Sequence, residues 1–444
     1  SDVYKRQFKM GAVFLPINWR LNPKEIAGVV SDSGLKILFY AEKHLSSLNE
    51  INPDYLHMDI DSDAYNQIVD PSQHHVYKAK AVEPTDLATL IYTSGTTGVP
   101  KGVMFSYESF VNNGANVELT YKFNSEYLTI ISTPMFHVLG FNDTVLPTLM
   151  SGGTLVLQRY FNGEELNDLI AQYHPDFLIM IPTMYYSTLN QKNFNPDDFR
   201  AIKFVIQGGS QPLPSIQQAF KKYGINIING YGLTEAPLVM VNTPENARHK
   251  PMSIGKSVMF VDAKVLDEDK NEVGDGEIGE LAIRSKNVTP GYWGQPEETK
   301  KSFHNQYFLT GDLAKKDEDG DIYIIDRKKE LIITGGENVL PSEVENALAE
   351  HPLIDRCVVV GYEHPKYGES IAAAIILREK VPDYVEQLDK HMRERLAGYK
   401  VPRMYLPVTH MPLNSTQKPD KLVIREMMNS KVNKESSSEA NHNA

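Results

Sequence analysis

The sequence predicts an α/β fold: a large N-terminal domain of α/β sheets plus a β-rich subdomain, and a small α+β C-terminal domain. Short apolar runs with little alternation recur along the chain, as is typical of strands buried on both faces. Helical patterns separate these runs, which favours a sheet with helices on its faces. The predicted strands are Leu87–Tyr92, Tyr127–Ser132, Gly153–Leu157, Phe177–Ile181, Phe204–Gln207 and Ile225–Ile228, with helices over Gly163–Tyr173 and Pro214–Tyr223.

The character of the sequence changes near Asp326. Before this residue come the β-rich segments Ala263–Leu266, Gly279–Arg284 and Asp321–Ile325. After it the pattern predicts a helix, two strands and an amphipathic helix, a unit of the size of a small domain. These elements are Pro341–Glu350, Cys357–Gly361, Ile371–Leu377 and Val385–Leu396. We therefore predict domains over 1–326 and 327–430, and a disordered, serine-rich tail over 431–444.

The N-terminal sequence suggests that the first helix–strand unit is incomplete. Residues 8–16 fit the end of a helix followed by a buried strand, and residues 1–7 fit no pattern. A truncated start is the interpretation, and a short protein is the alternative.

Composition narrows the class of protein. With 444 residues and 41% hydrophobic content, the chain can bury more than one core. A formal net charge of −12 argues against general nucleic-acid binding. The single cysteine, Cys357, excludes an intrachain disulfide. No signal sequence or run of 18 apolar residues is present, so we expect a cytoplasmic protein without a transmembrane segment.

A loop rich in glycine and hydroxyl residues follows the strand predicted at Leu87–Tyr92. Gly95 and Gly98 permit positive φ and a close approach, so successive N–H groups can cradle phosphate oxygens. The spacing is not that of a Walker A loop, which would need glycine where Pro100 stands. We predict a phosphate loop, with a flexible surface loop as the alternative. Its binding residues are Thr93, Ser94, Gly95, Thr96, Thr97, Gly98 and Lys101.

Six motifs in order over residues 92–418 resemble the adenylate-forming superfamily of acyl- and aryl-CoA synthetases, firefly luciferases and nonribosomal peptide adenylation domains. The chain is most similar to the acyl-CoA synthetase branch. The resemblance implies an ATP-dependent acid–CoA ligase, which forms acyl-AMP and pyrophosphate and then transfers the acyl group to CoA. ATP, Mg²⁺ and coenzyme A are the implied cofactors, and rotation of a mobile C-terminal domain separates the two steps.

The resemblance also implies roles for residues of the large domain. Tyr231 stacks on adenine, Thr234 binds the α-phosphate, and Glu235 with Thr96 binds Mg²⁺ through hard oxygen atoms. His137 is implied to line the acyl pocket as a candidate gate. Without the resemblance, a histidine at this position would be interpreted as a packed side chain. The remaining nucleotide-binding positions are Gly209, Asn229, Gly230 and Gly232.

The second half of the site lies between Thr310 and Lys418. By the resemblance, Asp312 takes both ribose hydroxyls with Arg327 as its partner, and Lys329 is the hinge. Lys418 is the catalytic lysine that reaches the carboxylate and the α-phosphate, although Gln417 stands where the family has glycine. Taken alone, each position also fits a turn or a surface residue. The loop at Gly335 and Gly336 is implied to line the pantetheine tunnel.

The expected pocket residues are small or apolar, which favours a fatty acid of medium or long chain. An aryl acid, such as a benzoate or succinylbenzoate, is the alternative, and a catalytically impaired nucleotide-binding homologue is another. A homodimer and, for a long-chain acid, weak peripheral membrane contact are further expectations. The pocket residues are Phe136, Val138, Gly208, Gly209, Ala236 and Leu238.

Overall fold

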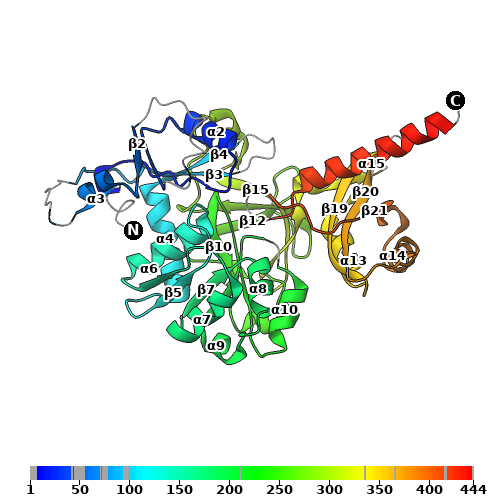
Figure 1. Cartoon of the computed structure of the whole chain (residues 1–444), viewed down its shortest axis with the longest axis horizontal. Helices are drawn as coiled ribbons and strands as arrows, with labels where there is room; N and C mark the ends of the chain where they lie inside the picture. The colour runs from blue at the N-terminus through cyan, green and yellow to red at the C-terminus, as the bar shows by residue number, and fades with distance from the viewer. Residues whose placement is uncertain are drawn as a thin grey trace. The chain divides into compact units, whose positions relative to one another are not determined.

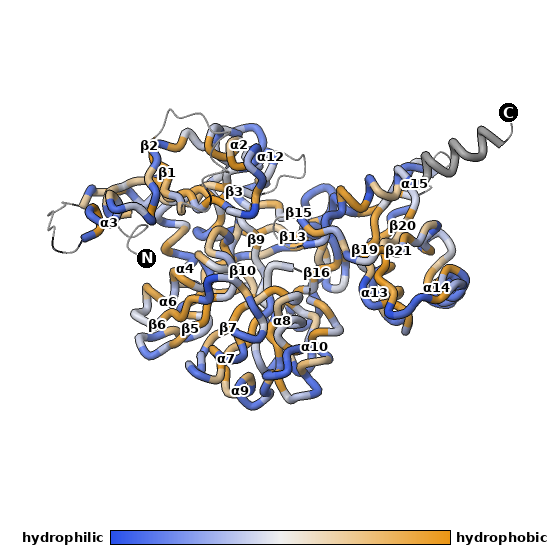
Figure 2. The backbone as a smooth tube through the Cα atoms, in the orientation of Figure 1, coloured by the Kyte–Doolittle hydropathy of each residue, from blue (hydrophilic) through white to orange (hydrophobic). Residues whose placement is uncertain are grey.

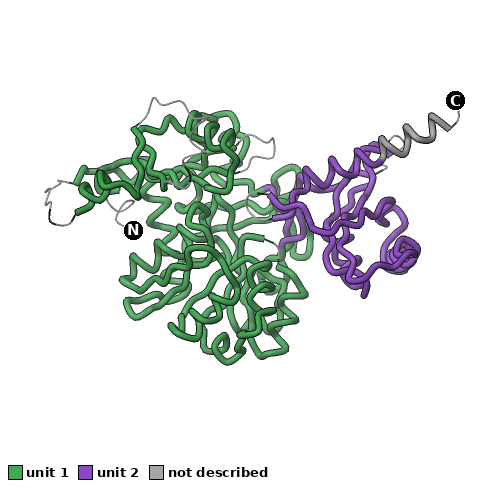
Figure 3. Tube along the Cα trace, in the orientation of Figure 1, with its two compact units in different colours: residues 1–310, 315–323 green, residues 311–314, 324–444 purple. Residues whose placement is uncertain are grey.

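A computed structural model describes residues 8–41, 44, 56–70, 72, 79–93, 100–210, 212–334, 337–364, 367–414 and 418–442, with side chains to 431. The chain forms two compact units (Figure 3). Unit 1 comprises residues 1–310 and 315–323, and unit 2 comprises residues 311–314 and 324–444.

The largest sheet of unit 1 has seven strands in the order β11-β10-β9-β8-β7-β5-β6 (Figure 1). Strands β6, β5, β7, β8 and β9 are parallel, whereas β10 and β11 run antiparallel to their neighbours. The predicted α/β class is confirmed. The strands are β5 Leu128–Ile131, β6 Thr154–Leu157, β7 Phe177–Met180, β8 Phe204–Gln207, β9 Ile228–Leu233, β10 Ala236–Val241 and β11 Lys256–Ser257.

Helices pack on this sheet because the central strands are apolar on both faces. All four residues of β7 are buried, and Leu166 and Ile170 of α7 pack in the same core cluster. Helix α7 begins where Asn162 accepts a hydrogen bond from the amide of Glu165. The helices of this region are α4 Tyr107–Tyr121, α5 Val138–Gly140, α6 Leu146–Met150, α7 Gly163–Tyr173, α8 Pro182–Leu189, α9 Pro196–Ala201, α10 Pro214–Lys221 and α11 Asn246–His249, with the π-helix η2 Phe141–Val145.

Besides the seven-stranded sheet and the sheet of unit 2, the described residues form three smaller sheets. Strands β1 and β2 are parallel, and β3 and β4 form an antiparallel pair. In the third sheet β12, β13, β15 and β14 are adjacent in that order, with β16 beside β15. The elements are α2 Pro23–Ser33, β1 Ile37–Tyr40, β2 Leu56–Asp59, α3 Asp63–Val69, β3 Leu87–Thr93, β4 Lys101–Ser106, β12 Asp262–Leu266, β13 Ile278–Arg284, α12 Pro296–Lys301, β14 Phe303–His304, β15 Tyr307–Lys316 and β16 Ile322–Arg327.

Unit 2 is built on a five-stranded sheet with helices on both faces. Strands β19 and β20 are hydrophobic over most of their length (Figure 2). Ala373 and Ile375 belong to a core with α13 and α14, and Ala372 to a core with α15. The elements are η3 Lys328–Glu330, β17 Ile332–Thr334, β18 Glu337–Val339, α13 Pro341–Ala349, β19 Ile354–His364, β20 Gly368–Leu377, α14 Tyr384–Arg393, η4 Gly398–Lys400, β21 Met404–Pro407 and α15 Lys421–His442.

The C-terminal segment begins as a helix of unit 2. Helix α15 extends to His442, into the range 431–444 that is predicted as a disordered tail. The polar composition suggested disorder, but neither glycine nor proline interrupts residues 421–442. Among the described residues, no helix is both long and apolar enough to cross a membrane.

Two further segments differ locally from the predicted pattern. The apolar run predicted as a strand over Ile225–Ile228 precedes β9, which begins at Ile228. Ile225 and Ile227 are nevertheless buried in the core. Near the N-terminus, the predicted strand is reduced to a single bridge between Phe14 and Thr89. Burial explains the apolar character of Ile225 and Ile227, whereas Val13 in the N-terminal segment is exposed.

A buried carboxyl group links the π-helix η2 to helix α4. Asp143 is 4% exposed, and its Oδ1 accepts a hydrogen bond of 3.0 Å from Nδ2 of Asn113. Burial raises the pKa of Asp143 to about 7, although the Asn113 hydrogen bond opposes this shift. The folded protein therefore holds a proton at this site that the unfolded chain releases near pH 4.

We predict that Asp143 makes the protein less stable as pH rises. Because the folded pKa lies above the unfolded value, its stabilising contribution is present below about pH 4 and is lost as pH rises through 7. In Asp143→Asn, which keeps a neutral acceptor for Asn113, the fall in free energy of unfolding between pH 5 and 8 should be shallower. Denaturant titrations at several pH values test this. Equal slopes for both proteins would contradict it, because other groups such as Glu345 contribute equally to both.

Candidate active site

The predicted phosphate loop joins two paired strands. Thr93, the last residue of β3, is the register partner of Lys101, the first residue of β4. The predicted residues between them, Ser94, Gly95, Thr96, Thr97 and Gly98, lie outside the described residues. Lys101 is largely buried, with 17% of its side chain exposed, and forms an ion pair with Glu298. Its ammonium lies 5.3 Å from the ring centroid of Tyr292.

Strand β9 and the turn after it carry the residues predicted to bind adenine and Mg²⁺. Tyr231 and Gly232 lie in β9, and Thr234 and Glu235 form the turn to β10. A Cβ atom on Gly232 would lie 2.6 Å from the amide nitrogen of Leu238. Close approach of the two strands therefore requires this glycine. The Glu235 carboxylate accepts a 2.9 Å hydrogen bond from the hydroxyl of Tyr292.

Asn229 is tied to the protein rather than left open to a ligand. Its Nδ2 donates to the carbonyls of Pro251 and Ser253, each at 2.7 Å. Its Oδ1 accepts from Gln207 at 3.1 Å and Gln217 at 3.0 Å. These four bonds use the full capacity of the amide group, so this side chain positions the start of β9.

The predicted acyl pocket brings together α5 and the glycine strip after β8. His137 precedes α5 and lies against Phe136, with ring centroids 4.6 Å apart. A Cβ atom on Gly208 would lie 3.3 Å from Cδ1 of Leu139. Gly209 has φ of +74°, a conformation that glycine adopts without strain. Leu139 thus borders the strip. The sequence analysis did not name Leu139 as a pocket residue, and its position two residues after His137 was the only indication of this role.

Asp312, Arg327 and Lys418 come together within unit 2. Asp312 is 4% exposed, and its Oδ1 lies 2.9 Å from Nε of Arg327. Gly311, inside strand β15, has φ of +72°, so the turn expected at Thr310–Asp312 is a left-handed residue within a strand. Asp326 is also buried and accepts from the amide of Ser342 at 2.9 Å. This bond fixes the chain immediately before Arg327.

The loop that carries Lys418 is closed at both ends by Asn414. The Asn414 amide donates to the Lys418 carbonyl at 2.8 Å, and the Lys418 amide donates to Oδ1 of Asn414 at 3.1 Å. Gln417 lies outside the described residues. Desolvation, followed by the Arg327 charge, lowers the pKa of Lys418 to about 8, while Asp312 and Glu330 oppose this. Lys418 is exposed to solvent, which screens these charges in part.

The hinge and tunnel positions lie on the first elements of unit 2. Lys329 is an exposed residue of the 3₁₀-helix η3. Thr334 and Glu337 are register partners at the ends of β17 and β18. Gly335 and Gly336, which connect these residues, lie outside the described residues.

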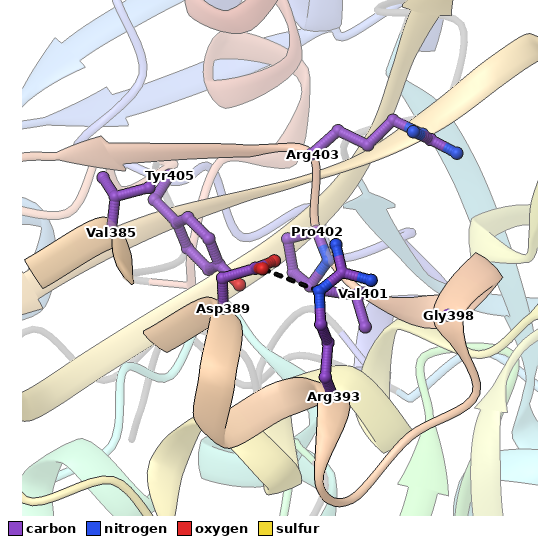
Figure 4. Close-up of a pocket in the computed structure, with 8 residues that line it drawn as sticks. All are labelled: Val385, Asp389, Arg393, Gly398, Val401, Pro402, Arg403 and Tyr405. Carbon is purple, nitrogen blue, oxygen red and sulfur yellow. Dashed lines mark hydrogen bonds and ion pairs between the residues drawn. The ribbon is translucent and has the colours of Figure 1, made fainter. Parts of the chain in front are cut away.

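Two other polar features contain none of the predicted site residues. The carboxylates of Asp317, Asp319 and Asp321 lie close together. The ammonium nitrogen of Lys250 lies 2.7, 2.7 and 3.0 Å from their respective Oδ2 atoms. The Lys250 ammonium is thus an internal cation that pairs with all three carboxylates. A cavity of about 280 Å³ lies in unit 2, where Arg393 points toward Asp389 (Figure 4). It is lined by Val385, Asp389, Arg393, Gly398, Val401, Pro402, Arg403 and Tyr405.

Comparison with known proteins agrees with this arrangement. A feruloyl-CoA synthase from Amycolatopsis sp. is 30% identical over 415 residues, covering 92% of this chain and 82% of that protein. The long-chain-fatty-acid–CoA ligase FadD13 of Mycobacterium tuberculosis is 32% identical over 437 residues, covering 96% and 85%. The structure of O-succinylbenzoate coenzyme A synthetase from Bacillus subtilis with ATP and magnesium ion has a TM-score of 0.81 at 25% identity, covering 95% of this chain and 85% of that one.

Two family models match the chain. One, described as AMP-binding enzyme, matches residues 7–293, and one described as AMP-binding enzyme C-terminal domain matches residues 343–418. The predicted AMP-forming acid–thiol ligase activity, with ATP, Mg²⁺ and coenzyme A, is confirmed. Because the first model covers more than half of the chain, this protein belongs to the AMP-binding enzyme family.

Proposed function

We propose that this ligase activates a fatty acid of medium or long chain along the glycine strip beside α5. The wall around Gly208 and Gly209 supports this proposal. A Cβ atom on Gly209 would lie 3.3 Å from Cγ2 of Ile181, and one on Gly208 would meet Leu139 at the same distance. These neighbours are apolar and offer no charge to bind the ammonium group of an amino acid. An alkyl chain would lose no hydrogen bonds there.

An aryl acid is the second candidate. The feruloyl-CoA synthase and the O-succinylbenzoate synthetase that resemble this chain are named for aryl acids, and a flat ring would also fit against backbone without side chains. Because a fatty acid and an aryl acid both need an apolar wall, the relative kcat/KM values for the two classes of acid distinguish them.

A panel of acids tests the substrate class. With ATP and Mg²⁺, decanoate and palmitate should release pyrophosphate with higher kcat/KM than benzoate or ferulate, and alanine should give no release. Gly208→Val, which would crowd Leu139, should lower kcat/KM for palmitate more than for acetate. A preference of the wild type for an aryl acid would select the second candidate, and a preference for an amino acid would contradict both.

The first reaction step brings two anions together, so positive charge and positioning dominate the barrier. We propose that Lys418 contacts the acid carboxylate and the α-phosphate, that Lys101 contacts the other phosphates, and that Thr234 donates to the α-phosphate. A unit charge pair at ~4 Å and an effective dielectric of ~20 interacts by about 4 kcal/mol. Glu235 fits a Mg²⁺ ligand, because it offers hard carboxylate oxygens, one of which accepts a hydrogen bond from the hydroxyl of Tyr292. When bound, the ion neutralises phosphate charge.

The remaining residues orient the nucleotide and separate the two steps. We propose that Asp312 and Arg327 hold the ribose hydroxyls and that Tyr231 stacks on the adenine. Rotation about Lys329 would then withdraw Lys418 and bring the segment at Gly335 and Gly336 to the thiol. The domain limits 1–326 and 327–430 belong to this proposal.

Removing the ammonium of Lys418 should separate the half-reactions. Lys418→Ala should slow adenylate formation by on the order of 10²–10³-fold, because a charge aimed at the transition state is lost. Transfer of decanoyl from supplied decanoyl-AMP to CoA should stay close to the wild-type rate. Pyrophosphate exchange and thioester formation measure the two steps, and an equal loss in both would contradict the assignment.

The charge of Lys418 should also limit activity at alkaline pH. Because desolvation and Arg327 lower its pKa, the required ammonium is lost well below the ordinary lysine value near 10.4. The kcat/KM for pyrophosphate exchange should therefore fall as pH rises through 8 to 9. Arg327→Gln should move this limb to higher pH, and an unchanged limb would contradict the charge coupling. A pH-rate profile of both proteins measures it.

Location and assembly stay predictions. We place the enzyme in the cytoplasm, since its single cysteine suits a reducing compartment. A homodimer is testable by sedimentation, and weak contact of a long-chain form with membranes by vesicle flotation.

A further inference from the structure

Tyr292 belongs to a segment that is bonded to both halves of the phosphate site. Within residues 289–293, called the strap below, the Thr289 amide donates to the Glu235 carbonyl at 2.7 Å. At the other end, the Trp293 amide donates to the carbonyl of Gly102 in β4 at 2.8 Å. The strap therefore connects the turn that carries Glu235 to the strand that begins at Lys101.

The position of Tyr292 within the strap is fixed by its own backbone. Its amide donates to Oγ1 of Thr299 at 2.9 Å, and Tyr292 forms an antiparallel bridge with Val103. Gly291, with φ of +143°, has no room for a side chain, because a Cβ atom would lie 2.4 Å from Thr299. The ring has little freedom to move, since Tyr292 is 8% exposed.

The side chain of Tyr292 meets two predicted ligand-binding groups. Its hydroxyl donates to Oε1 of Glu235 at 2.9 Å. The face of its ring lies 5.3 Å from the ammonium of Lys101.

We propose that Tyr292 is a positioning residue that fixes the Glu235 carboxylate for Mg²⁺ and holds Lys101 beside it. The proposal rests on the metal-binding role proposed for Glu235. A glutamate side chain has three rotatable torsions, and a hydrogen bond from a buried, backbone-fixed hydroxyl selects one orientation before the ion arrives. Partners of this kind, one step removed from the ion, change metal affinity by about 10–100-fold when they are mutated.

The test measures equilibrium binding of ATP while free Mg²⁺ is varied, so it needs no knowledge of the acid. In Tyr292→Phe, which keeps the ring and removes the hydroxyl, the free Mg²⁺ giving half-maximal ATP binding should rise about tenfold. Affinity at saturating Mg²⁺ should change little, because the ring still contacts Lys101. Tyr292→Leu should weaken ATP binding even at saturating Mg²⁺.

Tyr307→Phe is the matched control. Tyr307 is also buried, donates to the Asp262 carboxylate at 2.6 Å and has Arg284 4.9 Å from its ring centroid, but it is not a predicted site residue. This variant should report the general cost of losing a tyrosine–carboxylate bond, and its Mg²⁺ requirement should equal that of the wild type.

A double-mutant cycle with Glu235→Gln separates positioning from a general structural effect. Tyr292→Phe should add no further Mg²⁺ shift once Glu235 has lost its charge. An equal shift in both backgrounds, or a shift in Tyr292→Phe no larger than in Tyr307→Phe, would overturn the proposal. If Glu235→Gln alone left the Mg²⁺ requirement unchanged, the assignment of Glu235 would fail instead. Melting curves of each variant confirm that folded protein is compared.

Discussion

The antiparallel pairing of β9 with β10 is the constraint on which the proposed nucleotide site depends. Tyr231 lies opposite Met240 and Leu233 opposite Ala236, with an irregularity between these pairs. The two strands approach so closely that only glycine fits at position 232. This pairing places the Thr234–Glu235 turn at the end of the sheet, where the strap can bond to it. A side chain at Gly232 would separate the strands and move Glu235 with them.

Much of the fold follows from apolar periodicity alone. The predicted helix over Gly163–Tyr173 has the bounds of α7, and the predicted strand over Phe204–Gln207 has those of β8. Both elements are regular, and their burial is set by local pattern. The strand predicted over Ile225–Ile228 was wrong, because burial does not require strand pairing. Ile225 and Ile227 are buried although they lie in coil. Pairing depends on neighbours distant in sequence, which no local window contains.

The prediction of site residues has the same limit, because it uses local sequence and contains no contacts between distant residues. The family resemblance assigned roles to Glu235, Asp312 and Lys418, because each stands in a recognisable local motif, and these roles stay predictions. It missed Tyr292 and Glu298, because their partners lie 57 positions (Glu235) and 197 positions (Lys101) away along the chain. It also proposed Asn229 as a ligand group, although the side-chain amide is fully used inside the protein. A sequence motif identifies residue types, whereas hydrogen-bond capacity depends on the folded surroundings.

Two cations of the proposed site are paired with carboxylates in this structure: Lys101 with Glu298, and Arg327 with Asp312. Binding of a nucleotide would exchange or share these partners, so the cost of release matters. The Glu298 side chain is 37% exposed and can return to water, whereas the largely buried Lys101 would exchange it for a phosphate oxygen. Asp312 is buried, so an unpaired charge there would be costly. Ribose hydroxyls are donors and can satisfy the Asp312 oxygens. The Lys101–Glu298 pair can therefore open for phosphate on the Glu298 side, while the buried Asp312 carboxylate keeps hydrogen-bond donors throughout.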